Sequence, residues 1–444
     1  MNTSIAIALV TIALLFVFVF AGVHISFTLM TLSFVGLYLV TKNPATALSV
    51  ISTTSFNAIR TYTYCVIPLF MLMGTIMAVS GTAGDLFKWA HKMLEKIPGG
   101  LAAATVIGNA VFAAVTGVSV ASATVFSQVA IPEMRKYKYD PNFATGIVCG
   151  SSNLGMIIPP SLFFIVYGTV AQVSIGQLFV GGIVPGIIMA SIFIAYTSFY
   201  GSRHPSVIGL DENHKPLYED PDQSGKLKST LHALPIVALI IIVLGGIWGG
   251  FFTPTEASAI GCLGAFIIAL CKRSLTWKST GSILLDTSKS SAGILLLLVS
   301  AQMYGRLLSV SGAVSWVSSS ILNANLPGWL LIGIFLLLIL ALGCVIDGNS
   351  IILLTTPIIQ PVTQGLGFNQ VWWGVIVVMA VCIGQITPPF GTIVFACKNV
   401  LGDIVDVATI FKHTAPYIIL MLLTIAICMA FPSLVLFLPN MMMS

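Results

Sequence analysis

Small polar residues and proline pairs interrupt long apolar runs in both halves of the chain, in the same order. The breaks and the proline pairs lie at 116–123, 150–155 and Pro159-Pro160 in the first half, and at 343–350, 384–387 and Pro388-Pro389 in the second. A helix broken inside hydrocarbon leaves amides and carbonyls unpaired, which is costly unless protein, water or an ion satisfies them. Paired breaks of this kind are typical of the binding site of a secondary transporter.

The oxygen atoms at these breaks are suited to a weakly bound monovalent cation, and we expect Na+ rather than a transition metal. Backbone carbonyls, hydroxyls and amides are hard neutral donors, and unwound helices use them to hold Na+. The half-helices that begin after each break present positive dipole ends, which favour a carboxylate substrate. The candidate residues for sodium and substrate are Thr116, Gly117, Val118, Ser119, Ser122, Ser151, Asn153, Gly155 and Pro159 in the first half, and Gly343, Asp347, Gly348, Asn349, Gly384, Thr387 and Pro388 in the second.

Two acidic residues lie within or beside the apolar runs. Because a carboxylate inside a membrane is costly, function is the first interpretation of Asp347, which lies in a predicted turn. Glu256 instead follows Thr253-Pro254-Thr255, which predicts a helix start with Glu256 in a capping role. The six histidines are spread along the chain near predicted membrane edges, and we assign them to interfaces.

The composition places the chain in a lipid bilayer. Its 444 residues are 57% hydrophobic and 7% charged, with a mean hydropathy of +1.02, whereas about 25% of an ordinary soluble domain is charged. Uncharged runs such as 5–21 are long enough to cross the hydrocarbon core as helices. The eight cysteines show no CxxC spacing, which favours packing over metal or redox roles.

The pattern predicts an all-α polytopic membrane protein made of two inverted repeats. Each repeat has three crossings, a re-entrant hairpin and two further crossings, one of which is interrupted. In the first half we expect crossings at 4–21, 24–41 and 60–80, an amphipathic stretch at 83–97, a hairpin at 99–133, an interrupted crossing around 153–160 and a crossing at 176–200. After a polar linker at 202–228 we expect crossings at 231–250, 255–271 and 291–310, a hairpin at 327–362, an interrupted crossing at 371–397 and a last crossing at 414–436.

The positive charges agree with this order. A hairpin enters and leaves on one side, so each half crosses the membrane an odd number of times and the halves are inverted. With the first residue outside, all of the 19 lysines and arginines except Lys42, Arg60 and Arg306 face the cytoplasm. This distribution accounts for the net charge of +5 without nucleic-acid binding. The first hairpin then opens to the cytoplasm and the second to the outside.

Other function classes lack their signatures. The sequence has no convincing constellation of the kind an intramembrane protease needs, whether a Ser/His pair, paired aspartates or an HExxH motif, so we predict no enzyme. It has no P-loop, so the chain itself does not drive transport with ATP. A channel is harder to exclude, but two inverted halves with paired broken helices favour a carrier.

The chain resembles the large membrane subunit, DctM, of tripartite ATP-independent periplasmic (TRAP) transporters. The resemblance rests on five stretches spread over nearly the whole chain: Pro68–Gly74, Ile131–Met134, Gly155–Ser161, Thr253–Ala257 and Thr387–Gly391. Val118 stands where we expect a serine in this family, so an ion contact there requires its carbonyl. The resemblance implies sodium-coupled import of an organic acid, such as a C4-dicarboxylate or a sialic acid, across a bacterial inner membrane. The charge pattern, with the first residue outside, predicts both termini in the periplasm.

The resemblance also implies an elevator mechanism and two partners. The partners are a small membrane subunit of about four helices and a periplasmic substrate-binding protein, and neither is visible in the composition. The expected parts are scaffold and arm helices at 1–98 and 231–326, transport hairpins with interrupted helices at 99–175 and 327–403, a crossing with the cytoplasmic linker at 176–230, and a last crossing at 404–444. A stand-alone sodium-coupled dicarboxylate symporter of similar architecture is the alternative.

Overall fold

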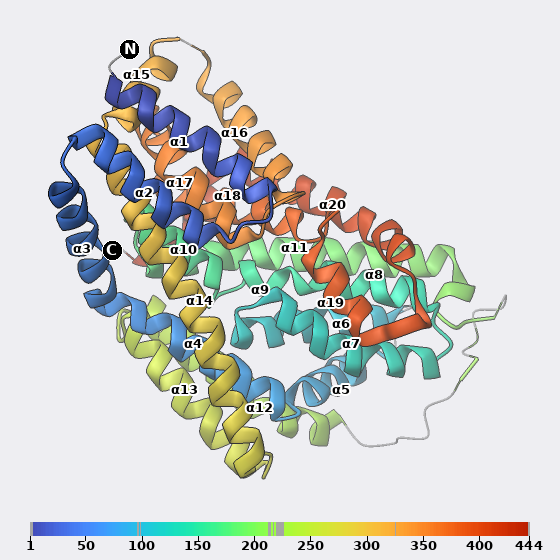
Figure 1. Ribbon diagram of the computed structural model, residues 1–444. Helices are drawn as coiled ribbons and strands as arrows, with labels where there is room; N and C mark the ends of the chain where they lie inside the picture. Colours follow the sequence, from blue (N-terminus) through green and yellow to red (C-terminus); the bar gives the residue numbers. More distant parts are fainter. Residues whose placement is uncertain are drawn as a thin grey trace.

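The computed structural model describes residues 3–95, 97, 99–211, 215, 217–218, 226–324 and 326–442, and these form helices joined by short turns (Figure 1). Lys96, which the charge pattern assigns to the cytoplasm, lies outside the described residues, as do 212–214, 216 and 219–225 of the predicted linker. The helices of the first half are α1 (Thr3–Phe20), α2 (Ile25–Thr41), α3 (Pro44–Arg60), η1 (Tyr62–Cys65), α4 (Val66–Val79), α5 (Thr82–Leu94), α6 (Gly100–Thr116), α7 (Ser119–Lys136), α8 (Pro141–Ser152), α9 (Leu154–Ile157), α10 (Leu162–Ala171) and α11 (Ile175–Arg203).

The second half repeats much of this order after the short turn η2 (Pro205–Val207). Its helices are α12 (Lys226–Trp248), α13 (Pro254–Cys271), α14 (Trp277–Val310), α15 (Ala313–Leu322), α16 (Gly328–Gly343), α17 (Gly348–Gly365), α18 (Gln370–Gly384), α19 (Thr392–Leu401), η3 (Gly402–Ile404), α20 (Val407–Ala430) and α21 (Pro432–Met442). Each half contains a helical hairpin, α6–α7 or α16–α17, followed by an interrupted helix, α8–α10 or α18–α19.

Eight segments of the described chain are long and apolar enough to span a membrane. They are Thr3–Phe20, Tyr62–Val79, Pro141–Ala171, Ile175–Arg203, Lys226–Trp248, Pro254–Cys271, Trp277–Val310 and Val407–Ala430. Of the ten predicted crossings, only two are missing from this set: α2 has 17 residues, and the crossing at 371–397 is split into α18 and α19. The prediction of an all-α polytopic membrane protein is therefore confirmed.

Helices α3 and α15 and the early start of α14 were not predicted, and the last predicted crossing, 414–436, is divided at Pro432 into α20 and α21. Helix α3 begins where Asn43 accepts the amides of Ala45 (2.9 Å) and Thr46 (3.3 Å), with Pro44 in the first turn. Helix α14 has 34 residues instead of the predicted 20, and Thr276 caps its start. The serines and threonines of its first half lower the hydropathy there, so that part was not predicted. Helix α15 is a short segment before the second hairpin. Helix α3 and the first half of α14 are polar and do not stand out in hydropathy, although cap residues mark both, while α15 is apolar but has only 10 residues.

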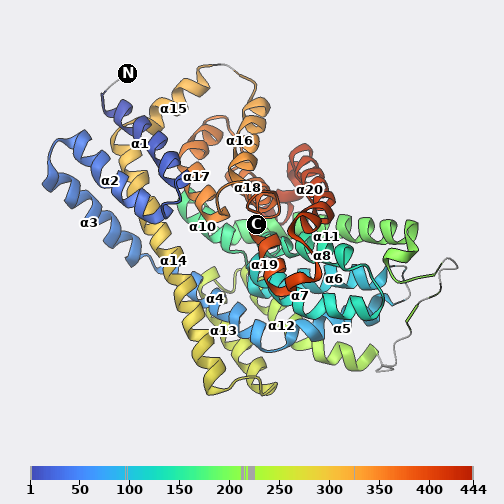
Figure 2. The same cartoon turned by 45° about the vertical axis from the view of Figure 1, so that its right-hand side comes forward.

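The two halves interlock through their hairpins and interrupted helices. Helix α7 of the first hairpin packs against α19 of the second half, and α17 of the second hairpin packs against α10 of the first. Figures 1 and 2 show both pairs side by side from two directions. Each hairpin therefore packs on the second part of the other half's interrupted helix, a reciprocal arrangement that brings the breaks of both halves into one region.

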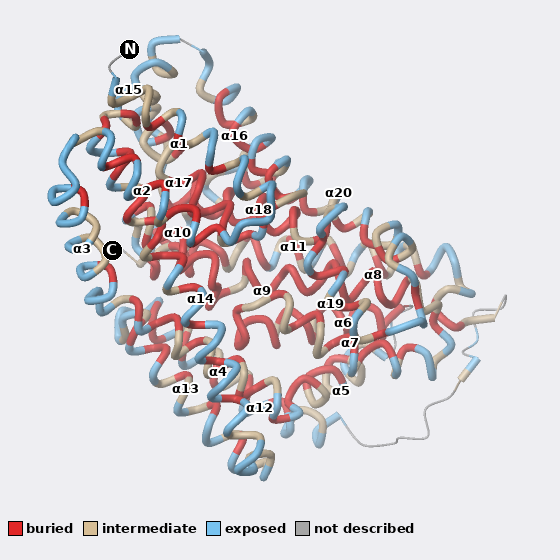
Figure 3. The backbone as a smooth tube through the Cα atoms, in the orientation of Figure 1, coloured by how far each residue is buried: buried red, intermediate tan, exposed pale blue. Residues whose placement is uncertain are grey.

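Burial separates two groups of helices. In Figure 3, the buried backbone is concentrated in α6, α8, α9, α10 and α18, whereas α1, α3, α12 and the lower part of α14 are largely exposed. Helix α4 packs on both α13 and α14, and α14 also packs on α2 and α3. Their exposed side chains include Phe266 and Leu284, as expected of surfaces that face lipid. The predicted boundaries of scaffold and transport parts stay predictions.

Candidate functional site

A pocket of about 450 Å³ lies where the two breaks of the second half meet the α1–α2 turn. Four candidate residues line it: Gly343, Asp347, Gly348 and Gly384. Its other lining residues are Val19, Gly22, Val23, His24, Ile25, Leu297, Val345, Ile346, Ser350, Val381, Gln385, Phe390, Gly391 and Thr392. The pocket therefore combines interrupted helices with a turn between two outer helices.

Two glycines bring the breaks into direct backbone contact. A Cβ added to Gly384, at the end of α18, would lie 2.5 Å from the Cα of Gly343, at the end of α16. A Cβ on Gly343 would lie 2.8 Å from the Cα of Gly384. Real Cβ atoms do not approach other atoms so closely, so these positions need glycine to keep the backbones together.

Asp347 caps helix α17. Its carboxylate accepts the amide of Ser350 at 3.1 Å and also accepts the Ser350 hydroxyl. The residue is exposed and lines the pocket, in the turn between α16 and α17. It thus has a structural role that the sequence reasoning did not assign, and its negative charge faces the pocket from the positive end of α17.

Substitutions at Asp347 separate the cap from the charge. We expect Asp347→Ala to lower the free energy of unfolding by about 1 kcal/mol, whereas Asp347→Asn changes it by less than about 0.5 kcal/mol because Asn caps equally well. Thermal unfolding of the purified variants in detergent measures both. If both variants lost the same free energy of unfolding, the capping role would be contradicted and the charge of Asp347 itself would be responsible.

The start of α19 differs from that of α17. Its N-cap residue, Gly391, provides no side-chain cap, and Gly391 and Thr392 line the pocket. The positive dipole end of a helix favours anions, although one amide of the first turn of α19, that of Ile393, donates to the carbonyl of Gln385 at 3.1 Å. One pocket thus has a carboxylate on one wall and a positive helix end on another.

The break of the first hairpin is seated on the Pro159-Pro160 segment. Gly117 has a φ of +63° between α6 and α7, and its carbonyl accepts the amide of Leu162 at 3.3 Å. A Cβ on Gly117 would lie 2.6 Å from the carbonyl oxygen of Pro160. The carbonyl of Val118 accepts the amide of Ser122 at 3.1 Å, which begins α7. Both proline pairs, at Pro159 and at Pro388, contain a cis peptide bond.

A buried amide that was not among the candidates organises the first half. Asn109 of α6 donates to the hydroxyls of Ser151 (2.8 Å) and Ser152 (3.0 Å), and its carbonyl accepts the Ser122 hydroxyl. All four residues are fully buried. Candidates Ser122 and Ser151 are therefore held together by Asn109. A polar amide in the middle of the apolar run 100–115 is unusual, and this could have identified Asn109 from the sequence.

A hydrogen bond connects the breaks of the two halves. The hydroxyl of Ser119, the first residue of α7, donates to Oε1 of Gln385 at 2.6 Å. Gln385 follows α18 and lines the pocket, but it is not among the residues predicted from the sequence. Ser119 is thus the first-half candidate that the structure joins to the second-half site.

Two candidate asparagines have buried carbonyl oxygens without a hydrogen-bond partner in the described part of the chain. They are Oδ1 of Asn153, between α8 and α9, and Oδ1 of Asn349, in the first turn of α17. The amide nitrogen of Asn153 lies 3.7 Å from Sδ of Met421. A buried carbonyl without a partner costs free energy, so each oxygen is suited to a ligand that would compensate it.

The remaining candidates support the breaks. The Thr387 hydroxyl donates to the carbonyl of Ile383 at 2.7 Å, and the Thr116 hydroxyl donates to that of Phe112 at 3.3 Å. A Cβ on Gly155 would lie 3.2 Å from the Cβ of Ala113. The structure therefore brings Gly343, Asp347, Gly348 and Gly384 to one pocket with Ser119 beside it, while Ser122 and Ser151 form a separate cluster with Asn109.

One of the histidines that we assigned to membrane interfaces, His24, also belongs to the wall of the pocket. It lies in the α1–α2 turn and lines the pocket. Its Nδ1 accepts the amide of Ser26 at 3.4 Å, which leaves Nε2 as the donor nitrogen. A single histidine between apolar runs gave no signal of this location.

Comparison with known proteins identifies the family. The model of the DctM component of tripartite ATP-independent periplasmic transporters matches residues 12–434. This chain belongs to the DctM family. The chain is 33% identical to the protein YgiK of Salmonella typhimurium over 94% of each protein. It is 30% identical to the C4-dicarboxylate TRAP transporter large permease protein DctM of Pseudomonas aeruginosa, over 87% of this chain and 88% of that protein.

A more distant relative agrees with this result, and a crystal structure shares the fold. The sialic acid TRAP transporter large permease protein SiaM of Vibrio cholerae is 27% identical over 95% of this chain and 96% of that protein. The YdaH transporter of Alcanivorax borkumensis shares the fold, with a TM-score of 0.61 at 13% identity over 88% of this chain and 90% of that chain. As a DctM protein, the chain is a transport component of the inner membrane and not an enzyme. The resemblance seen in the sequence is confirmed.

Proposed function

We propose that this DctM protein forms the translocation pathway of a sodium-coupled TRAP transporter that imports a small organic carboxylate. The observation that carries the sodium proposal is the pair of buried carbonyl oxygens of Asn153 and Asn349, which lack a partner among the described residues. Each lies at a helix break, where carbonyls and hydroxyls provide further oxygen ligands. Sodium is a transported co-substrate in this proposal.

The pocket supports a carboxylate as the substrate. The start of α19, which has no side-chain cap, supplies a positive dipole end, and His24 supplies a donor nitrogen from the α1–α2 turn. Relatives are named for C4-dicarboxylates, sialic acid and 2,3-diketo-L-gulonate, which are carboxylates, and one is named for isethionate, a sulfonate. We propose a carboxylate here without choosing among the members of that class.

Two further parts of the proposal come from the family. The partners are a small membrane subunit of about four helices and a periplasmic binding protein that delivers the substrate. The movement is an elevator motion, in which the two hairpins and the two interrupted helices shift together against the outer helices. Their reciprocal packing, α7 on α19 and α17 on α10, suits a group that moves as one body.

Uptake of labelled acids into proteoliposomes tests the proposal. We expect uptake that saturates with substrate and requires this chain, the small subunit, the binding protein and an inward sodium gradient together. Replacing external Na+ by K+ should reduce uptake to the background of empty liposomes, because the coupling ion is then missing. Uptake by this chain with sodium alone would favour the stand-alone symporter, and uptake independent of sodium would contradict coupling.

A further inference from the structure

A second pocket, unrelated to the helix breaks, opens on the outer helices. It measures about 480 Å³ and lies between α4, α13 and α14. Its lining residues are Leu69, Leu72, Ile76, Ala259, Cys262, Leu263, Phe266, Leu275, Thr280, Ile283 and Leu284. Thr280 and Cys262 are the only ones with polar side-chain atoms, so the pocket suits an apolar occupant.

The volume selects a thin occupant. An α-helix with its side chains is about 10–12 Å across, so two turns of helix require roughly 1,000 Å³. The pocket, of about 480 Å³, is open on one side. A single acyl chain of a lipid fits inside it, whereas a transmembrane helix of a partner would lie across its mouth.

Positive charge and an exposed indole lie at one end of the pocket. Leu275, in the α13–α14 loop, lines the pocket between Arg273 and Lys278 in the chain. Both cations are exposed, and within the described residues neither has an ion pair. Trp277 is 96% exposed and lies one turn of α14 before Thr280 of the pocket.

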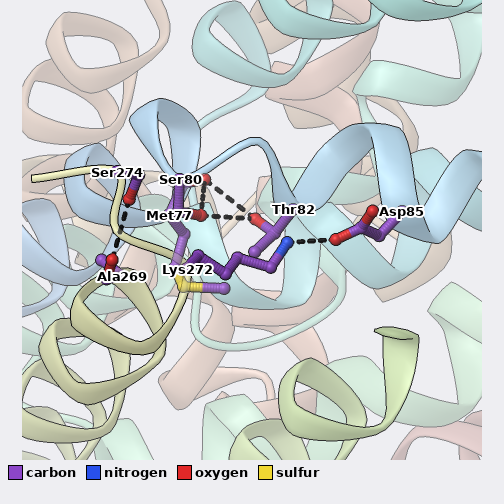
Figure 4. A network of polar contacts seen from close by, with 7 residues as sticks. All are labelled: Met77, Ser80, Thr82, Asp85, Ala269, Lys272 and Ser274. Carbon is purple, nitrogen blue, oxygen red and sulfur yellow. Dashed lines mark hydrogen bonds and ion pairs between the residues drawn. The ribbon is translucent and has the colours of Figure 1, made fainter. Parts of the chain in front are cut away.

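Lys272 differs from Arg273 and Lys278 because it already has an ion-pair partner. Figure 4 shows the side chain of Lys272 reaching Asp85 of α5, while the hydroxyl of Ser274 turns back to the carbonyl of Ala269 at 3.1 Å. The acidic residue of α14 closest in sequence, Asp286, lies about two turns beyond Lys278. The loop therefore keeps a net positive charge at the mouth of the pocket.

We propose that this pocket binds one anionic phospholipid, with an acyl chain between α4, α13 and α14 and the phosphate at Arg273 and Lys278. Trp277 then lies at the level of the headgroups, where tryptophan is enriched. The charge pattern of the sequence assigns this loop to the cytoplasmic side, whose leaflet carries the anionic lipids. The inference does not rest on the proposed transport activity.

The phosphate contacts, rather than the acyl chain, determine the selectivity. Membrane hydrocarbon is as apolar as the pocket, so the chain gains packing but no preference for one headgroup. Each basic residue near the membrane surface attracts an anionic lipid several-fold. Two such residues should give a preference on the order of tenfold for phosphatidylglycerol over phosphatidylcholine with the same acyl chains.

Native mass spectrometry of the full-length chain, titrated with these two lipids in detergent, measures this preference. We expect Arg273→Gln/Lys278→Gln to reduce it to near unity. The matched control Lys228→Gln/Lys289→Gln removes the same charge from α12 and from a later turn of α14. This control should keep the preference for phosphatidylglycerol. Cys262→Trp, which fills the pocket, should weaken the binding of both lipids. Ile267→Trp makes a similar change at an exposed position of α13 that does not line the pocket, and it should leave the binding of both lipids unchanged.

Three results would overturn the proposal. The first is equal binding of the two lipids by the unaltered chain. The second is a preference that survives Arg273→Gln/Lys278→Gln. The third is a complex with the small subunit that retains no anionic lipid although the chain alone retains it, because the subunit would then be the occupant of this face.

Discussion

Gly384→Ala is expected to reduce uptake to less than about a tenth of the unaltered transporter, because the new Cβ would lie 2.5 Å from the Cα of Gly343. The atoms that meet are backbone atoms, so no side chain can rotate away and α16 must move from α18. Overpacking of this kind costs about 1–3 kcal/mol of stability. Displacing groups of a binding site by about 1 Å can cost a hundredfold in rate.

The chain offers a matched control for this substitution on the neighbouring helix. Gly333 lies in α16, and a Cβ there would meet nothing within 4 Å. Gly333→Ala should therefore leave uptake and the thermal midpoint nearly unchanged, or raise the midpoint slightly through better helix propensity. Proteoliposome uptake and thermal unfolding measure both variants. If Gly384→Ala transports normally, the contact between the breaks is not needed for function.

The positions of most membrane-spanning helices were predictable because hydrophobic runs of about 20 residues form helices in a bilayer. The breaks were equally visible, since Gly117 and Gly384 interrupt runs in which other residues would continue a helix. Helix α3 was missed for a physical reason: it is too polar to be recognised by hydropathy. Its Asn43-Pro44 start was nevertheless a usable signal.

The pairing of side chains across the halves was not predictable. Ser119 and Gln385 are 266 residues apart, and their hydrogen bond depends on the packing of α7 against α19. A sequence without an alignment carries no trace of such a pair. His24 likewise reaches the pocket only because the α1–α2 turn lies against the second hairpin. Residue types identified the chemistry of the breaks, whereas the tertiary structure determined which oxygens share a site.

Asn349→Leu is expected to abolish sodium-dependent uptake without destabilising the sodium-free protein. Oδ1 of Asn349 is buried without a partner in the described part of the chain, so removing it relieves a desolvation cost of about 1–3 kcal/mol. An ordinary structural amide would show the opposite, because its removal leaves a former partner unsatisfied. Asn109 is such an amide, since it bonds Ser151 and Ser152, and Asn109→Leu should lower the thermal midpoint in any salt.

Sodium-dependent thermal stabilisation separates a ligand from a structural amide. A ligand that binds only the folded state at ten times its Kd stabilises it by about 1.4 kcal/mol, so the unaltered protein should unfold at a higher temperature in NaCl than in KCl. Asn349→Leu should lose this difference together with uptake, whereas Asn323→Ala, at the exposed end of α15, should keep both. A sodium-dependent shift that persists in Asn349→Leu would remove Asn349 from the site. If only Asn349→Leu loses the shift, sodium binds the carbonyl of Asn349 during transport. That binding would explain why the unaltered chain keeps a buried carbonyl despite its cost.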